Sequence, residues 1–415
     1  MKKIELLAPA GNLQKLMSAV HFGADAVYFG GPYSLRAFAD GFSPDRLREA
    51  LSFLHERGRR GYLTVNVFAR QEDLSGLEQY IELAASAGAD AFILSDPGVL
   101  RLVRRRAPHA EIHLSTQANT CNAEAVRFWA DQGVRRVVLA RELSLGEISA
   151  IRERIPPEIE LECFVHGAMC ISYSGRCLMS DYFTGRRANH GECVQACRWE
   201  YEIRELSRGW EQGLTLTEDA RGTYLLNSRD LNMIAHLREL AQAGIDSFKL
   251  EGRMKSEYYV GTVVNAYRRA LEDALSGRPF DPQWEEELKK TAHRAYTTGF
   301  YFGGDHPTQF CESSRPGQTF DFAALVLGYD GERGRLLVEQ RNRFAEGDLL
   351  EIVSAGEHHG KALAVAHMTD EQGCPVADAK RVQERLLLDC PFPLAPLDML
   401  RKARPQPEPS PEHSI

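Results

Sequence analysis

The sequence has few features that would place the protein in a membrane or on bulk nucleic acid. None of its 415 residues lies in an apolar run of eighteen, and the apolar stretch after Lys2 and Lys3 is too short for a signal peptide. The formal net charge is −8, which excludes a protein that coats RNA or DNA through bulk positive charge. We expect a cytoplasmic protein with no membrane segment, in which any RNA contact is local.

Several common catalytic and metal-binding motifs are also missing. The chain contains neither the H-E-x-x-H motif of metallopeptidases nor the G-x-S-x-G motif of serine hydrolases. No two cysteines have the C-x2-C spacing of most zinc ribbons. A cysteine–histidine peptidase stays open, although it would use only one of the clustered cysteines described next.

The most prominent feature that is present is a cluster of cysteines. Five of the nine cysteines lie between residues 162 and 197, and four of these stand among glycines, serines and arginines: Cys170, Cys177, Cys193 and Cys197. Thiols in polar, turn-rich sequence are not core residues, and in a cytoplasmic protein they indicate metal binding or redox chemistry. The spacing C-x6-C-x15-C-x3-C leaves zinc and an iron–sulfur cluster equally open.

A repeated pattern of helix end, glycine and short apolar run predicts a parallel sheet. The pattern occurs at residues 21–31, 86–96, 131–141 and 242–252, and further apolar runs occupy 4–8, 62–68, 111–115 and 160–165. Amphipathic helical stretches separate most of these runs. Eight such units over about 250 residues predict an α/β fold, a (β/α)8 TIM-like barrel. Residues 166–241 are then a long cysteine-rich insertion after the seventh strand.

The composition divides the chain into four predicted segments. The barrel occupies 1–300, a linker follows at 301–318, a small antiparallel β-barrel at 319–400 and a disordered tail at 401–415. Short alternating apolar runs between glycine-rich turns predict the β-domain. The proline-rich composition of RPQPEPSPEHSI predicts the disorder of the tail.

Active sites of TIM barrels lie at the carboxyl ends of the strands. The polar side chains at these predicted ends are Asn66, Asp96, Ser115, Gln117, Arg141, His166, Glu251 and Arg253. We predict catalytic roles for His166, Glu251 and Arg253. The alternatives are a histidine that only hydrogen-bonds the loop, a simple Glu251–Arg253 salt bridge, and helix-capping roles for Asn66, Asp96 and Gln117.

Several segments carry a resemblance to a known family. The segment ECFVHGAMCISYSGRCLMS at 162–180 resembles the signature of the collagenase-like peptidase family U32. The resemblance covers the whole barrel, because it extends to ELLAPAGN at 5–12, GADAVYFGG at 23–31, NSRDL at 227–231 and KLEGRMKSEYY at 249–259.

This resemblance implies an oxygen-independent hydroxylation protein that carries a 4Fe-4S cluster and acts on tRNA uridine, ribosomal RNA cytidine or a ubiquinone precursor. The peptidase label of the family is older. A barrel followed by a β-domain is similar to the tRNA branch, which forms 5-hydroxyuridine at the wobble position with prephenate as the hydroxyl source. The resemblance implies Cys170, Cys177, Cys193 and Cys197 as metal ligands, because the cysteine that several relatives carry after NSRDL is Asn232 here.

The implied substrates suggest further binding residues. Prephenate is a dicarboxylate, and guanidinium groups bind carboxylates in bidentate geometry. The candidate donor-binding residues are Arg141, Arg176, Arg229 and Arg253. For tRNA, the four arginines between Arg176 and Arg198 are interleaved with aromatic residues that can stack unpaired bases. A paralogous subunit is the other partner that we consider.

Two other functions stay open at this point. One is a collagenase-like peptidase, and the other is a non-catalytic RNA-binding protein whose cysteines hold a structural zinc ion. Cys163 within the seventh strand and the isolated Cys121, Cys374 and Cys390 are interpreted as core or surface thiols rather than ligands.

Overall fold

The computed structural model describes residues 3–34, 42–170, 172–173, 177–186, 193–199, 218–219, 222–223, 229–303 and 317–405. Within those ranges, no helix combines the length and the apolar character needed to span a bilayer.

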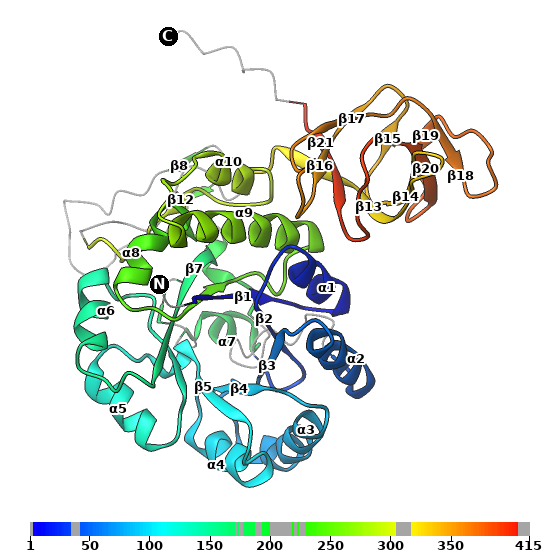
Figure 1. The fold of residues 1–415 in the computed structure, drawn as a ribbon. Helices are drawn as coiled ribbons and strands as arrows, with labels where there is room; N and C mark the ends of the chain where they lie inside the picture. Colours follow the sequence, from blue (N-terminus) through cyan, green and yellow to red (C-terminus); the bar gives the residue numbers. More distant parts are fainter. Residues whose placement is uncertain are drawn as a thin grey trace.

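Eight parallel strands form a closed barrel (Figure 1). The strands are β1 (Glu5–Pro9), β2 (Ala26–Gly30), β3 (Arg60–Thr64), β4 (Ala91–Leu94), β5 (Glu111–Leu114), β6 (Arg136–Val138), β7 (Glu160–Ala168) and β11 (Ser247–Leu250). β11 pairs in parallel with both β7 and β1, and this double pairing closes the barrel. The predicted TIM-like barrel and its eight strands are therefore confirmed.

Helices surround the barrel in the order expected for βα units. They are α1 (Leu13–His21), α2 (Pro44–His55), α3 (Leu74–Ser86), α4 (Pro97–Arg106), α5 (Ala123–Asp131), α6 (Leu145–Arg152), α8 (Leu237–Gln242) and α9 (Glu257–Leu275). The glycine of each repeat lies where a helix has just ended. Gly23, Gly88, Gly133 and Gly244 have φ angles of 105°, 92°, 72° and 91°, in the left-handed region that favours glycine.

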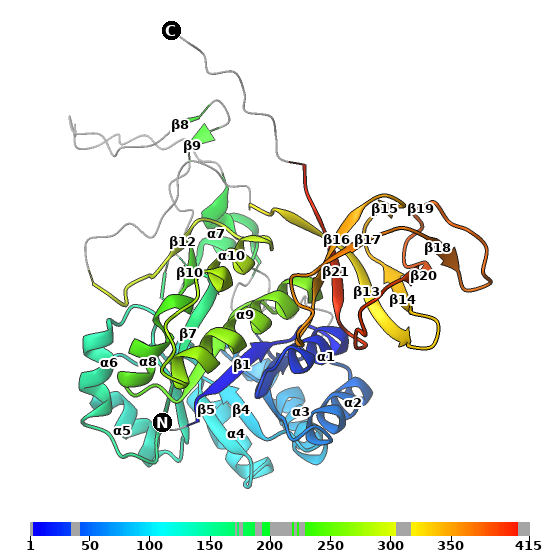
Figure 2. The same cartoon turned by 45° about the horizontal axis from the view of Figure 1, so that its top comes forward.

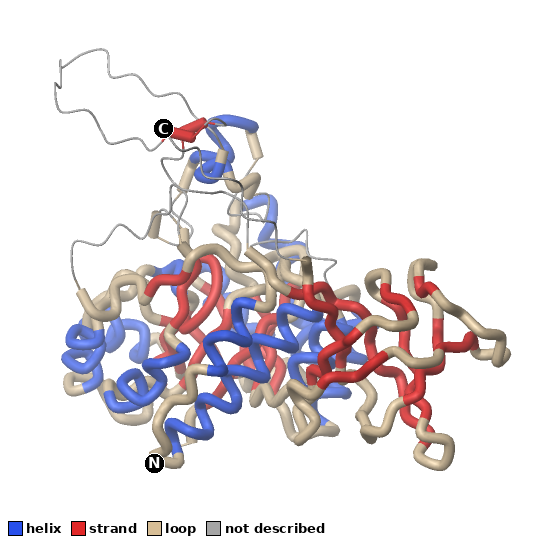
Figure 3. Tube along the Cα trace, turned by 90° about the horizontal axis from the view of Figure 1, so that it is seen from above, coloured by secondary structure: helices blue, strands red, loops and turns tan. Residues whose placement is uncertain are grey.

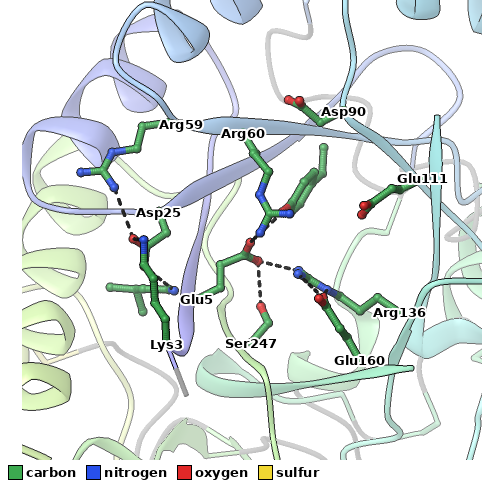
Figure 4. A network of polar contacts seen from close by, with 12 residues as sticks. Lys3, Glu5, Asp25, Arg59, Arg60, Asp90, Glu111, Arg136, Glu160 and Ser247 are labelled. Carbon is green, nitrogen blue, oxygen red and sulfur yellow. Dashed lines mark hydrogen bonds and ion pairs between the residues drawn. The ribbon is translucent and has the colours of Figure 1, made fainter. Parts of the chain in front are cut away.

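The amino-terminal end of the barrel is filled by a network of charged side chains (Figure 4). Glu5 lies at its centre and accepts hydrogen bonds from Arg136 at 2.5 Å, Tyr62 at 2.7 Å and Ser247 at 3.0 Å. Burial opposes ionisation of Glu5, but the charge of Arg136 outweighs it, and the pKa of the carboxyl falls to about 2. Because this end is plugged, chemistry at the barrel axis belongs at the opposite end.

The insertion after β7 extends the sheet beyond the carboxyl ends of the barrel strands (Figure 2). β10 (Asp230–Asn232) runs antiparallel to the end of β7, and β12 (Tyr296–Thr297) pairs in parallel with β10. The other described elements of the insertion are α7 (Met179–Thr184), the 3-10 turns η4 (Ala196–Arg198) and η5 (Ile234–His236), and the short pair β8 (Glu218–Asp219) and β9 (Gly222–Thr223).

The C-terminal domain is an antiparallel half-barrel, consistent with the predicted β-domain. Its seven-stranded sheet has the order β17-β16-β21-β13-β14-β20-β18, and β15 pairs with β19. The strands are β13 (Phe320–Asp330), β14 (Arg335–Gln340), β15 (Phe344–Ala345), β16 (Leu349–Val353), β17 (Ala362–Ala364), β18 (Met368–Asp370), β19 (Asp378–Ala379), β20 (Arg385–Asp389) and β21 (Met399–Ala403). The domain has its own apolar core, which includes Val338, Phe344 and Leu386.

The two domains share a continuous interface along α9, α1 and α10 (Gln283–Lys289), and Figure 3 shows the strand-rich domain beside the barrel. Phe322 stacks on Tyr258 of α9 with ring centroids 5.5 Å apart. Fully buried Arg401 donates to Glu287 of α10 at 2.8 Å. Phe322 also belongs to the same apolar core as the barrel helices, so the two domains bury one common core surface.

The structure describes parts of the predicted linker and tail. In the 301–318 linker it describes 301–303 and 317–318, and Gly317 forms a β-bridge with His293. The last strand, β21, continues to Ala403, within the range predicted for the tail, because Arg401 is held in the interface. Residues 406–415 of that tail lie outside the described residues.

Candidate functional site

The candidate site lies at the carboxyl ends of the barrel strands, where the sequence predicts it. Arg253 follows β11 and is buried there. One Nη of its guanidinium donates to Thr64 Oγ1 at 3.0 Å and to Ser34 Oγ at 3.1 Å. Gly30 is needed beside this group, since a Cβ atom at this position would lie 2.3 Å from Ser34 Oγ and 2.4 Å from Thr64 Oγ1. The close packing fixes one guanidinium at the barrel mouth.

Glu251 lies two residues before Arg253, at the end of β11. The Tyr28 hydroxyl donates to the Leu250 carbonyl at 2.9 Å and lies 3.3 Å from Glu251 Oε2, and the Glu251 backbone N–H donates to the His166 carbonyl at 2.9 Å. Gly167 of β7 has a φ of +106° and packs so closely that a Cβ would lie 2.7 Å from the Glu251 carbonyl oxygen. The carboxyl of Glu251 therefore lies beside the Tyr28 hydroxyl, on a backbone fixed by β7.

An ion pair that the sequence analysis missed lies beneath Glu251. Lys249 Nζ lies 2.8 Å from Glu162 Oε1, and both side chains are buried within the barrel. The ammonium group also lies 4.5 Å from the ring centroid of Tyr28 and 5.4 Å from that of Phe164. Burial lowers the pKa of Lys249. Burial opposes the charge on Glu162, but Lys249 and Arg136 outweigh it and lower its pKa.

The sequence holds only a partial signal for this pair. Glu162 and Lys249 each interrupt an apolar run, in ELECFV and SFKL, and a charged side chain within a buried strand is normally paired. The sequence does not indicate which charges pair, because 87 residues separate the two.

His166 lies near the end of β7 and is enclosed by aromatic rings. The centroids of Tyr267, Tyr296 and Tyr259 lie 5.3, 5.7 and 6.0 Å from that of the imidazole. Its Nδ1 lies 3.4 Å from the Tyr267 hydroxyl oxygen, whose shortest hydrogen bond goes to the Val165 carbonyl at 2.8 Å and which lies 3.1 Å from Asn232 Oδ1. Burial lowers the pKa of His166 to about 3, so the imidazole is neutral near pH 7. Its catalytic role stays a prediction.

The predicted donor-binding arginines lie in different surroundings. Arg141 is buried, donates from Nη1 to the Ala168 carbonyl at 2.9 Å, and lies with its guanidinium carbon 5.2 Å from the Phe164 ring centroid. Arg229 directly precedes β10, and Arg176 lies outside the described residues. Arg141 and Lys249 thus face the same aromatic ring, Phe164, at the barrel mouth.

Buried polar atoms without a protein partner follow two neighbouring strands. Among the described residues, Ser95 Oγ after β4, Gln117 Nε2 after β5 and Thr120 Oγ1 form no hydrogen bond. Buried polar atoms are normally paired, so these three atoms are unsatisfied polar groups within the packed carboxyl end of the barrel. Asp96 has a different role, because its Oδ1 accepts from Gly98 N at 2.7 Å and Val99 N at 3.0 Å and caps α4.

The four clustered cysteines lie in the insertion that follows β7. Cys170 and Cys193 are exposed, and Cys177 and Cys197 are partly exposed. Ser180 links α7 to the segment that carries Cys193. Its Oγ lies 3.8 Å from Cys193 Sγ and accepts a hydrogen bond from Val194 N at 3.2 Å.

The chemistry of these thiols fits a thiolate-bound metal. The eight cysteines that the structure describes form no disulfide. Cys163 is of a different kind, since burial in the core raises its pKa to about 12. In the described part of the chain, no three His, Cys, Asp or Glu side chains are grouped closely enough to hold a metal ion. The fit therefore rests on the four accessible thiols and not on a preassembled ligand sphere.

Comparison with known proteins assigns both parts of the chain to one family. The profile described as Peptidase family U32 matches residues 11–310. The profile described as Peptidase family U32 C-terminal domain matches residues 318–401.

Curated relatives have names from two functional classes. The "tRNA hydroxylation protein P1" of Bacillus subtilis (strain 168) is 40% identical over 97% of this chain and 96% of its own. The "tRNA hydroxylation protein P" of Escherichia coli (strain K12) is 38% identical over 85% of this chain and 87% of its own. The "Collagenase" of Porphyromonas gingivalis (strain ATCC BAA-308 / W83) is 34% identical over 72% of this chain and 73% of its own. The match of the family profile to most of the chain, together with these identities, shows that the protein belongs to peptidase family U32.

Proposed function

We propose that this protein hydroxylates C5 of the wobble uridine in tRNA without dioxygen, with a 4Fe-4S cluster on the clustered cysteines and prephenate as the hydroxyl donor. The observation that carries the proposal is the similarity, over nearly the whole of both chains, to a relative named as a tRNA hydroxylation protein. The cysteine-rich insertion at the catalytic end of the barrel supports it.

The electron balance of this reaction limits what the donor must be. Hydroxylation at C5 replaces a C–H bond with a C–O bond and removes two electrons from the uracil ring. If the oxygen comes from a C–O bond of the donor, the donor carbon gains the hydrogen and the same two electrons. The exchange then balances without an external oxidant. A bound 4Fe-4S cluster supplies one-electron transfer, and Cys170, Cys177, Cys193 and Cys197 would hold it.

The barrel mouth suits an anionic donor. Arg141 and Arg253 are buried guanidinium groups, which bind carboxylates strongly where water is excluded. Arg176 and Arg229 remain proposed donor-binding residues.

The remaining predicted site residues have distinct roles in this proposal. Glu251, beside the Tyr28 hydroxyl, accepts the proton released from C5 of the base and returns it to the donor carbon. His166 is neutral and enclosed, and through Tyr267 and Asn232 it positions β7 and β10, between which the insertion runs. Arg253 binds the donor and balances the charge of Glu251.

An isotope experiment tests the proposal directly. Anaerobically reconstituted protein is incubated with unmodified tRNA and prephenate that carries oxygen-18 in its ring hydroxyl. Mass spectrometry of the digested tRNA should find oxygen-18 in 5-hydroxyuridine, at a level that does not depend on dioxygen. Product that carries oxygen from dioxygen or water would contradict the donor assignment, and absence of 5-hydroxyuridine would contradict the reaction.

Peptidase activity is a second candidate, because one relative is named a collagenase. The two proposals differ in their requirement for the metal. Release of peptides from gelatin by metal-free protein, with no change in tRNA nucleosides, would favour the peptidase. Zinc in place of iron and sulfide in anaerobically purified protein would favour a structural metal and a non-catalytic RNA-binding role.

A further inference from the structure

Three large aromatic side chains are exposed together on the insertion. Tyr182, Phe183 and Trp199 have exposed fractions of 84%, 46% and 40%. The ring centroids of Tyr182 and Phe183 are 5.2 Å apart, and those of Phe183 and Trp199 are 6.1 Å apart. We call these three residues the aromatic platform. Adjacent rings of this size that remain exposed mark an interaction site rather than a folding requirement.

The aromatic platform is supported by two short elements that pack on each other. Tyr182 and Phe183 lie in α7, and Trp199 follows η4, where its N–H donates to the Ala196 carbonyl at 3.0 Å. The Val194 N–H donates to Ser180 Oγ of α7 at 3.2 Å, which joins the two elements. The rings are therefore presented by ordered backbone, which reduces the entropy lost when a ligand stacks on them.

Two of the candidate metal ligands lie in or next to these two elements. Cys197 belongs to η4, two residues before Trp199, and Cys193 Sγ lies 3.8 Å from Ser180 Oγ of α7. A metal ion or cluster on these cysteines would fix the position of the aromatic platform. A substrate bound there would also lie next to the proposed redox centre.

The charges near the rings favour a nucleic acid over an apolar protein surface. Arg186 follows α7 and is exposed, and it is the described guanidinium beside the rings, against Asp181 within α7. Aromatic faces stack on unpaired bases, and guanidinium groups bind the adjoining phosphates. Aromatic and arginine side chains also occur at protein interfaces, and RNA is favoured here because the relative that matches over nearly the whole chain is named as a tRNA hydroxylation protein.

We propose that the aromatic platform stacks the unpaired bases next to the target nucleotide in an RNA loop. The inference rests on the proposed function, because it deepens the assignment of tRNA as substrate. It assigns the recognition of single-stranded RNA to α7 and η4, at the catalytic end of the barrel. The C-terminal domain is then free to contact the RNA elsewhere.

A binding experiment on the full-length, metal-loaded protein tests the inference. The probe is a fluorescently labelled anticodon stem–loop RNA that contains an unmodified wobble uridine, and anisotropy gives its dissociation constant. Tyr182→Ala and Trp199→Ala should each weaken binding about tenfold, and Trp199→Phe should restore most of the affinity, because a ring face remains. Phe128→Ala is the matched control, since Phe128 is 57% exposed on α5, and it should leave binding unchanged.

Each outcome of this experiment supports or contradicts the inference. Unchanged RNA affinity in both alanine variants, with wild-type iron content and thermal unfolding, would overturn it. If the alanine variants kept their RNA affinity but lost hydroxylation activity when a protein supplies the electrons, the aromatic platform would bind that protein. This result would also contradict the inference. RNA binding is measured without turnover. The role of the aromatic platform in RNA binding can therefore be confirmed even if the protein forms no 5-hydroxyuridine, and it can be wrong even if the protein does. A double-stranded RNA of equal length should bind all variants equally weakly.

Discussion

Lys249 and Glu162 form an ion pair within the barrel that shapes the floor of the candidate site. The ammonium group is surrounded by the rings of Tyr28 and Phe164, and the Tyr28 hydroxyl in turn lies beside the carboxyl of Glu251. Removal of the charge on one partner leaves the other buried and unpaired, which costs much more than loss of an exposed pair. The pair therefore supports the fold and the carboxyl of Glu251 together.

We predict that Glu162→Gln lowers the free energy of unfolding by about 3 kcal/mol, because Lys249 loses its buried counter-charge. Urea denaturation followed by circular dichroism measures the change. Glu49→Gln is the control, since its pair with Arg46 is exposed and should contribute little. Equal stability of the Glu162→Gln variant and the wild type would show that the ion pair is not structurally important.

His166 makes a separate prediction about pH. The imidazole has a pKa of about 3 in the folded state and an ordinary value of 6.5 when unfolded. Between these values the unfolded chain binds a proton that the folded protein does not, so the protein loses stability as the pH falls below 6.5. The loss from this one group is about 1.4 kcal/mol per pH unit.

The variant His166→Gln should remove this contribution. We expect the difference in unfolding free energy between pH 7 and pH 5 to be smaller in the variant than in the wild type, by about 2 kcal/mol. His55→Gln is the control, because the His55 side chain is 43% exposed. If the wild type and His166→Gln lost stability in parallel, His166 would not be the enclosed neutral group described above.

Among the elements of the barrel, the end of β2 and Arg253, three residues beyond β11, are packed together. Gly30 leaves the space in which Ser34 and Thr64 hold the Arg253 guanidinium. The position therefore requires glycine for steric reasons. Nothing in the sequence alone relates Gly30 to Arg253, because more than two hundred residues separate them.

We predict that Gly30→Ala displaces this guanidinium and weakens binding of the anionic donor about tenfold, since hydrogen bonds to charged groups contribute most to such recognition. Calorimetric titration with prephenate measures the effect. Gly146→Ala is the control, because a Cβ at Gly146 would have no atom within 4 Å. A normal donor affinity in Gly30→Ala would remove Arg253 from the proposed donor site.

The barrel strands were predictable because the signal for each is local. A glycine that ends a helix and an apolar run that follows it lie within one short segment, as at Gly88 and β4. The antiparallel strand β10 was not predicted, because it is short and pairs with β7 across the whole insertion. Its pairing depends on contacts far apart in sequence, which composition and periodicity do not encode.

The positions of the candidate site residues were predictable from the sequence, but their contacts were not. The position of His166, Glu251 and Arg253 at strand ends follows from the barrel order. Their partners do not, because Tyr28, Ser34 and Tyr267 reach them from other elements. The signal for the Lys249–Glu162 pair is one charged residue within each of two apolar strands, and it does not indicate which charges pair.

At the scale of the whole molecule, the C-terminal domain is part of the barrel's support. Arg401 of β21 is fully buried and bonded to Glu287 of α10 and Glu351 of β16. Burial opposes ionisation of Glu287, but His359 and Arg401 outweigh it and hold its pKa far below the ordinary value. Removal of the domain would expose the apolar surface around Tyr258, so truncation affects folding before it affects RNA binding.

We predict that Arg401→Met lowers the free energy of unfolding by about 2 kcal/mol, because Glu287 and Glu351 lose their fully buried partner and keep only the less buried Lys290 in common. Thermal unfolding of the full chain measures the loss. Arg404→Met is the control, since its pair with Asp321 is largely exposed. A wild-type unfolding temperature in Arg401→Met would indicate that the two domains are stable independently of this contact.

The central claim is that the clustered cysteines on the barrel make this protein a tRNA-hydroxylating enzyme. Its most direct test is mass spectrometry of tRNA nucleosides from cells that lack the protein and its paralogues. We predict that 5-hydroxyuridine and its derivatives are absent, that the wild-type gene restores them, and that Cys170→Ala and Cys177→Ala do not, although both variants accumulate. An unchanged nucleoside profile in the deletion strain, or full restoration by the cysteine variants, would contradict the account.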